Sequence, residues 1–514
     1  MLPCARASCC AASARDRVVE PPSRAHADRR DAVLAPALAA GLVFLASGAV
    51  LVLEILGVRL LAPYVGLTLE TTTSIIGTAL AGIALGSALG GRVADRTDPR
   101  WLLTGLLAVG GLLALLCVPI VRTLGPALRE GGDATALGVA LLALLPPAAV
   151  LSAVTPTVTR LQLRDLSASG TVVGRLSAWA TAGALAGTFG TGFVLVPLVP
   201  VGTSVAAVGA VLVLTGVALG LWTGTASADR AAGFAAAAVA LSVLTLGSGA
   251  PCDAESTYHC AQVVEDPARE GGRVLVLDDL NHSYVDLDDP RRLEFDYVRW
   301  IGDAVDALAP AGKPLDSVFA GGGGFTLPRY VAATRPGSRA SVLEVDGELV
   351  ELVRDRLGLE TGPDLRVSVG DARVTLRGLP AGSADLLVGD AFSSRAVPWH
   401  LATAEWVEDV RRVLRPGGLY AVNVIDHEPL ALLRAEAATL LGAFADVRLV
   451  ARPGADGPAG GNLVLLASDR PLAPGVRSNA RGANTLDRSA VERLAAGADP
   501  LTDDDAPADQ LLSG

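Results

Sequence analysis

The sequence predicts a multi-pass α-helical membrane domain followed by an α/β domain with a parallel sheet. Three observations lead to this fold class. Long apolar stretches recur through the first 250 of the 514 residues, and short β-rich runs alternate with amphipathic stretches after residue 255. Charge divides in the same way: the first 250 residues carry 16 basic and 12 acidic residues, the rest 26 and 41. A second half this acidic has no basic face that could neutralise the phosphates of a nucleic acid. Nucleic acid is therefore not expected as a partner.

The first half is predicted to cross a lipid bilayer about seven times. Residues 1–32 carry six arginines among small and polar residues, and are expected to form a disordered basic leader and not a cleaved signal peptide. Within the predicted membrane domain, residues 33–250, each apolar stretch has roughly the 20 residues that a helix needs to cross ~30 Å of hydrocarbon. Buried helices of a soluble protein would need polar faces that these stretches lack. The expected spans are 34–56, 72–91, 101–121, 136–156, 177–199, 203–224 and 231–249.

The arginines predict how these spans are oriented. Thirteen fall on one side, in the leader, in loops 92–100 and 157–176 and at Arg230, whereas three fall on the other side. Short cytoplasmic loops retain positive charge, so a cell-membrane protein with a cytoplasmic N-terminus is expected. Seven spans would then place the C-terminal half outside. The seventh stretch is rich in alanine, which contributes little to membrane insertion, and is therefore the weakest candidate span. If it does not cross, the C-terminal half lies in the cytoplasm. The side of the membrane on which the C-terminal half lies therefore stays open.

Two cysteines at the start of the second half allow two interpretations. Cys252 and Cys260 flank the segment CDAESTYHC, and no cysteine follows them. A pair close to a predicted outer surface suits a disulfide, and two incidental thiols are the alternative. A metal site is not expected, because only His259 lies nearby and no second cysteine pair exists.

The second half, residues 251–470, is divided into a β module over 255–300 and an α/β unit over 313–470, and an acidic tail follows over 471–514. In the β module, 273–279 and 282–288 are expected to pair as a hairpin. In the α/β unit, strands alternate with helices, which implies a parallel sheet with crossover connections. The expected strands are 317–320, 340–346, 365–371, 384–390 and 419–425, with helices over 326–334, 347–357 and 401–414 and a turn at RPGG, 415–418.

Candidate binding residues follow four successive predicted strands. Four glycines, 321 to 324, stand between the first strand and a helix, where the backbone can approach a ligand closely. Glu344 ends the second strand, about 20 residues further on, where an acid can bind both ribose hydroxyls. Asp371 and Ala372 follow the third strand, at a position suited to an adenine edge, and Asp390 ends the fourth. Ligands of parallel sheets bind beyond these carboxyl ends, so a nucleoside site is predicted there.

The same residues argue against other nucleotides. The sequence has neither GxGxxG nor a Walker lysine after these strands, which disfavours dinucleotides and nucleoside triphosphates.

These motifs resemble those of the spermidine synthase family of polyamine aminopropyltransferases, and the chain is similar to bacterial forms fused to a membrane domain. The resemblance rests on GGGG, EVD, GDA and GDAFSS, together with RVLVLDD, EFDY and PGG, and covers roughly 255–470 plus 501–511. It implies a Rossmann-like fold of the S-adenosylmethionine-dependent transferase type. Decarboxylated S-adenosylmethionine is the implied co-substrate, no prosthetic group is expected, and the aminopropyl group would pass to a di- or polyamine.

The resemblance also implies a role for each matched residue. Asp390 would accept the proton of the attacking amine, a step that is needed because amines are protonated near neutrality. Tyr297 would orient the amine. The residues implied at the nucleoside are Gly321, Gly322, Gly323, Glu344, Asp371, Ala372 and His282, the last of which stands where the family has glutamine.

Several positions depart from the family pattern. Gly324 replaces an aspartate that contacts the aminopropyl ammonium, Ser393 replaces a second aspartate after the fourth strand, and Val298-Arg299 replaces His-Glu. The residues that would bind the nucleoside are thus present, whereas fewer carboxylates remain to bind cationic amines. Aspartates of the hairpin or of the tail are candidates to replace them.

Two other functions stay open from the sequence. A transporter or sensor that binds polyamine or nucleoside without turnover is one, because residues 90–96 loosely resemble a carrier loop and Glu54 lies in an apolar span. Glu54 is also close to Arg59, and the two are expected to form a structural pair. A methyltransferase is the other, since the fold is shared. The expected partners are a polyamine, a nucleoside of the S-adenosyl type and the lipid bilayer, and a homo-oligomer stays open.

Overall fold

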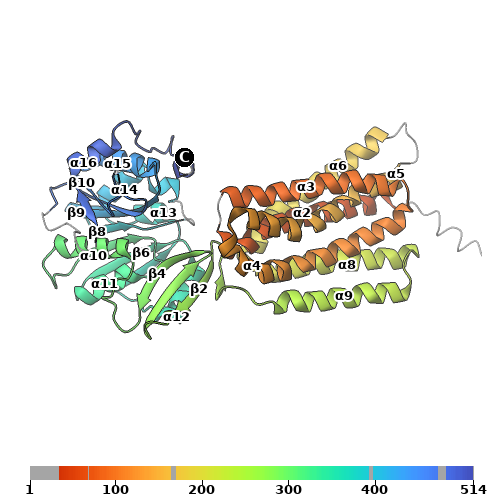
Figure 1. Ribbon diagram of the computed structural model, residues 1–514, viewed down its shortest axis with the longest axis horizontal. Helices are drawn as coiled ribbons and strands as arrows, with labels where there is room; N and C mark the ends of the chain where they lie inside the picture. The colour runs from red at the N-terminus through yellow and green to blue at the C-terminus, as the bar shows by residue number, and fades with distance from the viewer. Residues whose placement is uncertain are drawn as a thin grey trace, which may run out of the picture.

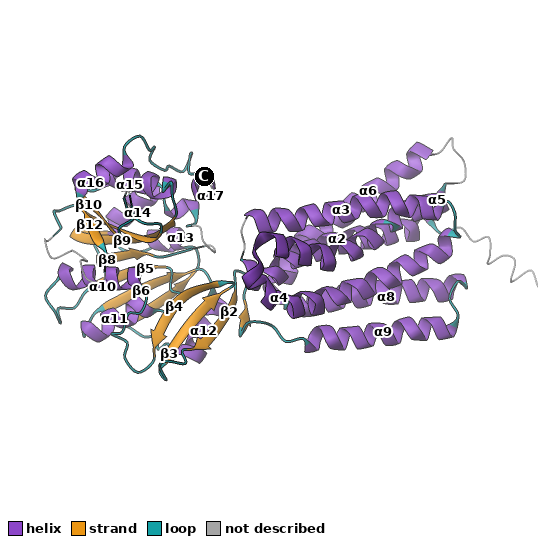
Figure 2. Ribbon diagram, in the orientation of Figure 1, coloured by secondary structure: helices purple, strands orange, loops and turns teal. Residues whose placement is uncertain are grey.

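A helical bundle and an α/β domain lie end to end in the computed structural model (Figure 1). The structure describes residues 34–66, 69–163, 169–392, 397–455, 457–472 and 482–512. The predicted leader, Ser393 and part of the predicted tail lie outside the described residues. Helices alone build one half, and strands with covering helices build the other, so the predicted fold class is confirmed (Figure 2).

Within the described ranges, seven helical stretches are long and apolar enough to cross a membrane, the number that the sequence predicts. The seventh is not the least apolar of them, since the fifth has a lower mean hydropathy. Helix α4 carries the third stretch and, together with α5, the fourth, and α6, η2 and α7 together form the fifth. The helices of the bundle are α2 (Pro36–Val65), α3 (Leu69–Ala94), α4 (Pro99–Ser152), α5 (Val154–Gln162), α6 (Ser169–Gly190), η2 (Thr191–Leu195), α7 (Val196–Leu198), α8 (Val201–Thr223) and α9 (Ala228–Gly247).

An antiparallel sheet of four strands follows the bundle. Its order is β1-β2-β3-β4, and the predicted hairpin forms its β3–β4 pair. Strands β1 and β2 were not expected. β1 has only two residues, too few for a periodic signal. The strands are β1 (Ala254–Glu255), β2 (Cys260–Glu265), β3 (Gly272–Leu277) and β4 (Leu280–Asp286), and α10 (Asp296–Leu308) leads from them to the main sheet.

The main sheet has eight strands in the order β12-β10-β11-β9-β8-β5-β6-β7. Its five predicted strands pair in parallel, as expected, whereas β10, β11 and β12 add an antiparallel edge. The parallel strands are β5 (Asp316–Ala320), β6 (Arg339–Glu344), β7 (Leu365–Val369), β8 (Ala384–Gly389) and β9 (Leu414–Asp426), and the other three are β10 (Asp446–Ala451), β11 (Gly461–Ser468) and β12 (Asn484–Leu486).

Helices cover both faces of the main sheet. Successive apolar side chains of its strands point to opposite faces, so both faces are apolar. Phe319 of β5 packs in one core with α10, α11 and α12, and its neighbour Val318 packs in the other with α13, α14, α15 and α16. The covering helices are α11 (Thr326–Thr334), α12 (Gly347–Leu357), α13 (Ala372–Arg377), α14 (Ala404–Val413), α15 (Ala431–Ala443), α16 (Arg488–Ala495) and α17 (Ala508–Leu512).

Two local predictions differ from the structure. The helix expected from 401 begins at Ala404, because the Thr403 side chain caps it by accepting from the amide of Trp406 (3.3 Å). The RPGG turn lies inside β9 as an irregularity: Ala384 pairs with Leu414 but Leu386 pairs with Leu419, so residues 415–418 bulge from the ladder.

The segment set apart as a tail also packs on this domain. Strand β12 joins the main sheet, and Arg373 of α13 holds Asp503 through two hydrogen bonds of 2.7 Å.

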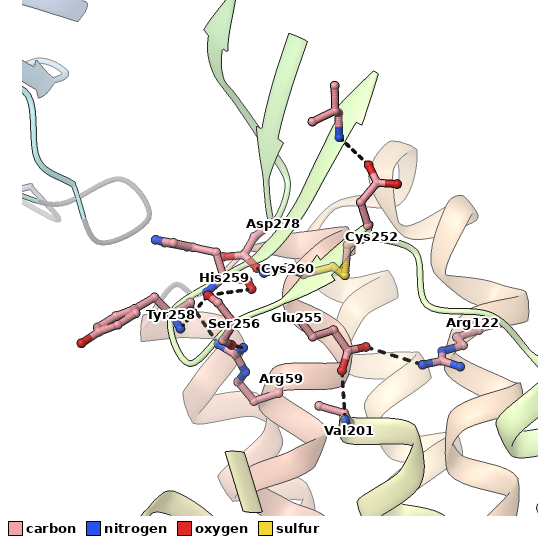
Figure 3. The surroundings of a disulfide bond; sticks show 12 residues. Arg59, Arg122, Val201, Cys252, Glu255, Ser256, Tyr258, His259, Cys260 and Asp278 are labelled. Carbon is pink, nitrogen blue, oxygen red and sulfur yellow. Dashed lines mark hydrogen bonds and ion pairs between the residues drawn. A yellow bond between two sulfur atoms is a disulfide. The ribbon is translucent and has the colours of Figure 1, made fainter. Parts of the chain in front are cut away.

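The two halves meet at residues 251–260 (Figure 3). Cys252 and Cys260 are joined by a disulfide, which settles the alternatives left open by the sequence. Arg122 of α4 lies 3.7 Å from Glu255, and Glu255 also accepts from the amide of Val201 at the start of α8 (2.9 Å). The C-terminal half thus contacts the bundle through a short loop that the disulfide closes.

Arg59 of α2 makes a further polar contact between the two halves. Its guanidinium donates to the backbone carbonyls of Tyr258 (2.9 Å) and Ser256. The expected pair of Arg59 with Glu54 is therefore wrong, because the Arg59 side chain binds the C-terminal half instead.

Candidate functional site

The glycine turn after β5 is the first component of the site. Gly321 has φ +96°, and a Cβ there would lie 2.4 Å from the carbonyl oxygen of Asp390. Its amide donates to the carbonyl of Leu343 (2.9 Å), which binds the turn to β6. Only glycine can adopt this φ angle and lie this close to the backbone that follows β8. The turn therefore brings the ends of β5, β6 and β8 together.

Glu344, at the end of β6, holds the same turn from the other side. Its buried carboxylate accepts from the amides of Gly322 (2.7 Å) and Gly323 (3.4 Å). The second carboxylate oxygen accepts from the amide of Asp346 (2.9 Å), the residue that caps α12. The acid predicted to bind ribose is thereby fixed beside the glycine backbone.

Asp371 follows β7 and caps α13. It accepts from the amide of Val374 (2.9 Å), and its other oxygen lies 2.8 Å from Nε2 of His400. Partial burial raises the pKa of Asp371, but these two hydrogen bonds and the nearby imidazole outweigh it and hold the pKa below its ordinary value. The carboxylate therefore stays ionised and oriented beside Ala372.

Asp390 lies just beyond β8 and is the most perturbed acid of the site. Its side chain accepts from Asn423 Nδ2 (2.9 Å) and, more weakly, from the Tyr297 hydroxyl (3.3 Å). Burial raises the pKa of Asp390 to about 6, although the two hydrogen bonds act in the opposite direction. The pKa of Tyr297 is raised well above its usual value by burial and by the Asp390 charge, so the phenol remains a donor. A carboxyl group with a pKa near neutrality is suited to proton transfer.

One cavity of about 500 Å³ collects most of the predicted residues. Gly322 and Tyr297 are not part of its wall; they lie beside Asp390 in a small neighbouring hollow. The sequence-predicted residues that line the cavity are Gly321, Gly323, Glu344, Asp371, Ala372, Asp390 and His282.

His282 lies at the boundary of this cavity. It also lines a second cavity of about 800 Å³, which Tyr297 and Asn423 line as well. Burial, with a smaller effect of nearby His259, lowers the pKa of His282 to about 4, so the imidazole is neutral at physiological pH. Its neighbour Ser283 accepts from the amide of Gly324 (3.0 Å), which fixes β4 against the glycine turn.

Four polar residues of the site were not predicted from the sequence. Asn423 and His400 position the two aspartates, and Tyr258 and His259 line the nucleoside-sized cavity. A signal for Asn423 exists, since it is an amide inside the apolar strand LYAVNVI. His400 and the 258–259 pair carry no comparable local signal.

Tyr258 and His259 belong to the disulfide-closed loop (Figure 3). His259 Nδ1 lies 3.1 Å from Asp278, whose other oxygen accepts from the amide of Cys260 (3.0 Å). The Ser256 hydroxyl donates to Asp346, which caps α12. The loop is thus bound both to the cavity and, through Arg59, to the bundle.

Metal binding is not part of this arrangement as far as the structure describes it. In the described ranges, no group of three or more His, Cys, Asp or Glu side chains is placed to hold a metal ion.

Comparison with known proteins finds similarity over part of the chain. No protein-family model matches it. Among curated proteins, a polyamine aminopropyltransferase from Vibrio vulnificus is 28% identical over 169 residues, which cover 31% of this chain and 54% of that protein. The chain thus matches about half the length of this relative.

Solved structures give related matches. A probable spermidine synthase from Corynebacterium glutamicum is 30% identical, with 48% of this chain and 94% of that chain covered and a TM-score of 0.44. A spermidine synthase in complex with the transition-state analogue AdoDATO is 17% identical, with 43% and 73% covered and a TM-score of 0.34.

Proposed function

Because part of the chain is homologous to spermidine synthases, we propose that the protein transfers an aminopropyl group from decarboxylated S-adenosylmethionine to an amine. Diamines and polyamines are the acceptors that the family resemblance implies. The similarity favours this activity over transport or sensing without turnover. The single observation that carries the proposal is Asp390, a half-buried carboxyl group with a pKa near neutrality that lines the 500 Å³ cavity and accepts hydrogen bonds from two residues of the 800 Å³ cavity.

The reaction needs a base beside the attacking amine. The amine nitrogen attacks the carbon next to the sulfonium of the donor, the carbon–sulfur bond breaks, and its electron pair leaves with methylthioadenosine. The nitrogen must lose one proton, and the ionised form of Asp390 accepts it. The Tyr297 and Asn423 side chains hold the carboxylate in place during this transfer.

The donor is assigned to the 500 Å³ cavity. Glu344 would bind the ribose hydroxyls, and Asp371 with Ala372 would bind the adenine edge. The open backbone of Gly321 and Gly323 would face the methionine-derived part. Support comes from the order of these residues, which follows the order of the parallel strands from which they extend.

The seven apolar helices are proposed to anchor the protein in the cell membrane. Two contacts, of Arg59 and of Arg122, connect the bundle to the loop that lines the donor cavity. The bundle would therefore hold the transferase domain at the bilayer surface.

Replacement of Asp390 by asparagine tests the activity. The Asp390→Asn full-length protein, in detergent, should release methylthioadenosine at least ~100-fold more slowly than the unmodified protein, because general-base catalysis is lost. Binding of methylthioadenosine, measured by calorimetry, should change little and serves as the control. If the unmodified protein releases no methylthioadenosine with any diamine, polyamine or amino acid acceptor, the proposal fails.

A further inference from the structure

The 800 Å³ cavity is placed to receive the acceptor. His282 and Phe392 line both this cavity and the donor cavity. Tyr297 and Asn423, which both donate to Asp390, lie in its wall. An amine that reaches Asp390 from this side leaves its distal end in the 800 Å³ cavity, so the groups there select the acceptor.

The charged side chains of this cavity form one connected cluster. Arg299 lies 3.4 Å from Glu294 and 3.5 Å from Asp296. Arg452 also contacts Asp296, and Arg292, just outside the wall, lies 2.7 Å from Glu294. Each of the two carboxylates is therefore already in contact with two guanidinium groups.

The cluster disfavours a second ammonium group. The cavity wall holds two guanidinium groups and two carboxylates, and Arg292 beside it also contacts Asp286 (4.0 Å), so neither carboxylate of the wall lacks a guanidinium partner. A diamine dication would place its distal ammonium beside guanidinium groups and would find both carboxylates compensated. A distal carboxylate meets the opposite situation, because guanidinium groups bind carboxylates through paired N–H donors.

Arg452 is exposed enough to make such a contact beside its ion pair with Asp296. Its side chain is 66% exposed, so it can turn toward a ligand without first losing its hydration. Arg299 is 23% exposed and fixed between Glu294 and Asp296. Together they offer one adaptable and one fixed guanidinium group in the wall of the cavity.

We infer that the acceptor is an amine that carries a carboxylate, of the ω-amino acid or diamino acid class, and is not a diamine dication. The inference rests on the proposed aminopropyl transfer. The attacking nitrogen gives its proton to Asp390 and forms the new carbon–nitrogen bond, methylthioadenosine leaves with the electrons of the carbon–sulfur bond, and the acceptor carboxylate stays bound to Arg299 and Arg452 unchanged.

Matched acceptors test this specificity. Full-length protein in detergent is given decarboxylated S-adenosylmethionine with 5-aminopentanoate or cadaverine, and with 4-aminobutanoate or putrescine; each pair differs only in its distal group. Above the pKa of Asp390, kcat/KM for methylthioadenosine release should be about 10-fold higher or more with the carboxylate of each pair. Faster release with the diamines overturns the inference and leaves the proposed function intact.

Variants locate the effect. Arg452→Gln should raise KM for 5-aminopentanoate about 10-fold with little change in kcat, and Arg299→Glu should reverse the preference toward cadaverine. Arg411→Gln is the matched control, because Arg411 forms an exposed pair with Asp469 away from both cavities. If Arg299→Glu does not fold, the exposed Arg452 still provides the test, and an unchanged KM in Arg452→Gln contradicts the inference.

Two further measurements separate the remaining outcomes. Calorimetry on protein saturated with methylthioadenosine should show tighter binding of 5-aminopentanoate than of cadaverine; equal or opposite affinities overturn the inference even where turnover is absent. Replacing the donor by S-adenosylmethionine tests the other source of a carboxylate. Turnover only with that donor would assign the carboxylate to the donor and overturn the assignment to the acceptor.

Discussion

At the scale of single residues, the balance of forces on Asp390 sets the pH at which the site can work. Burial disfavours the charged form and raises the pKa to about 6, while the Asn423 and Tyr297 donors favour the charged form. Transfer requires the ionised carboxylate. Activity should therefore be low below pH 6 and rise with pH through that value.

Asn423→Leu should shift this pH dependence. The variant removes a donor that stabilises the carboxylate, so the pKa of Asp390 rises and the acidic limb of kcat moves to higher pH by about one unit. Profiles of methylthioadenosine release against pH measure the shift. Tyr297→Phe removes the longer hydrogen bond and should move the limb in the same direction by less. A limb that stays in place, or moves to lower pH, would argue against Asp390 as the base.

The residues of the donor cavity differ in how far the sequence reveals them. Glu344, Asp371 and Asp390 each follow a strand, so the parallel sheet alone brings them to one edge. Asn423 lies within β9 and reaches Asp390 only because Gly389 pairs with Val422 across the β8–β9 ladder. Register between strands is a tertiary property, and a single strand does not encode it locally.

At the scale of elements, the disulfide-closed loop is held by contacts from several directions. Arg59 binds it to α2, the Ser256 hydroxyl binds it to Asp346, and Tyr258 with His259 line the donor cavity. The side chains of the loop that line the 500 Å³ cavity are therefore positioned in part by a helix of the bundle.

Arg59→Gln should weaken donor binding. Loss of a charged donor to two carbonyls loosens the loop, so KM for decarboxylated S-adenosylmethionine should rise about 10-fold while kcat changes less. Steady-state kinetics measure this split. Arg160→Gln is the control, since Arg160 pairs with Asp95 on an exposed part of the bundle. Equal effects of both variants would mean that the bundle acts only through overall stability.

Elements with a strong period could be predicted, and those defined by their partners could not. Helices 326–334 and 347–357 appear as expected because their apolar faces are local, and the second also has a local cap in Asp346. β1 exists only as the partner of β2, and β12 only as the partner of β10. The RPGG segment has the residues of a turn, yet pairing of β9 on both sides of it keeps it within the strand.

At the scale of the whole molecule, the number of apolar helices that cross a bilayer would determine on which side of it the C-terminal half lies. Arg59, Arg122 and the start of α8 all contact the C-terminal half, whereas most arginines of the first half belong to the leader and to the loops predicted to be cytoplasmic. If all seven helices cross and the N-terminus is cytoplasmic, the C-terminal half is expected on the outer side.

Reporter fusions check this topology. Alkaline phosphatase fused after Gly514 should be active and fluorescent protein fused there should be dark, whereas fusions after Thr225 should give the reverse. The expected position also agrees with the Cys252–Cys260 disulfide, which persists in oxidising compartments. Fluorescence at Gly514 would mean that one stretch does not cross. An outer location obliges the nucleoside donor to reach that side of the membrane.

The loop that joins the halves also determines which truncated proteins give meaningful measurements. A protein cut at residue 250 keeps both cysteines but loses the guanidinium of Arg59 and the cation that faces Glu255. Its two loop carbonyls and one carboxylate would then face solvent, and the wall of the donor cavity would relax. A kinetic constant measured on such a fragment would describe an enzyme with a loosened cavity wall. Low or absent activity of the fragment would therefore say little about the activity of the intact chain.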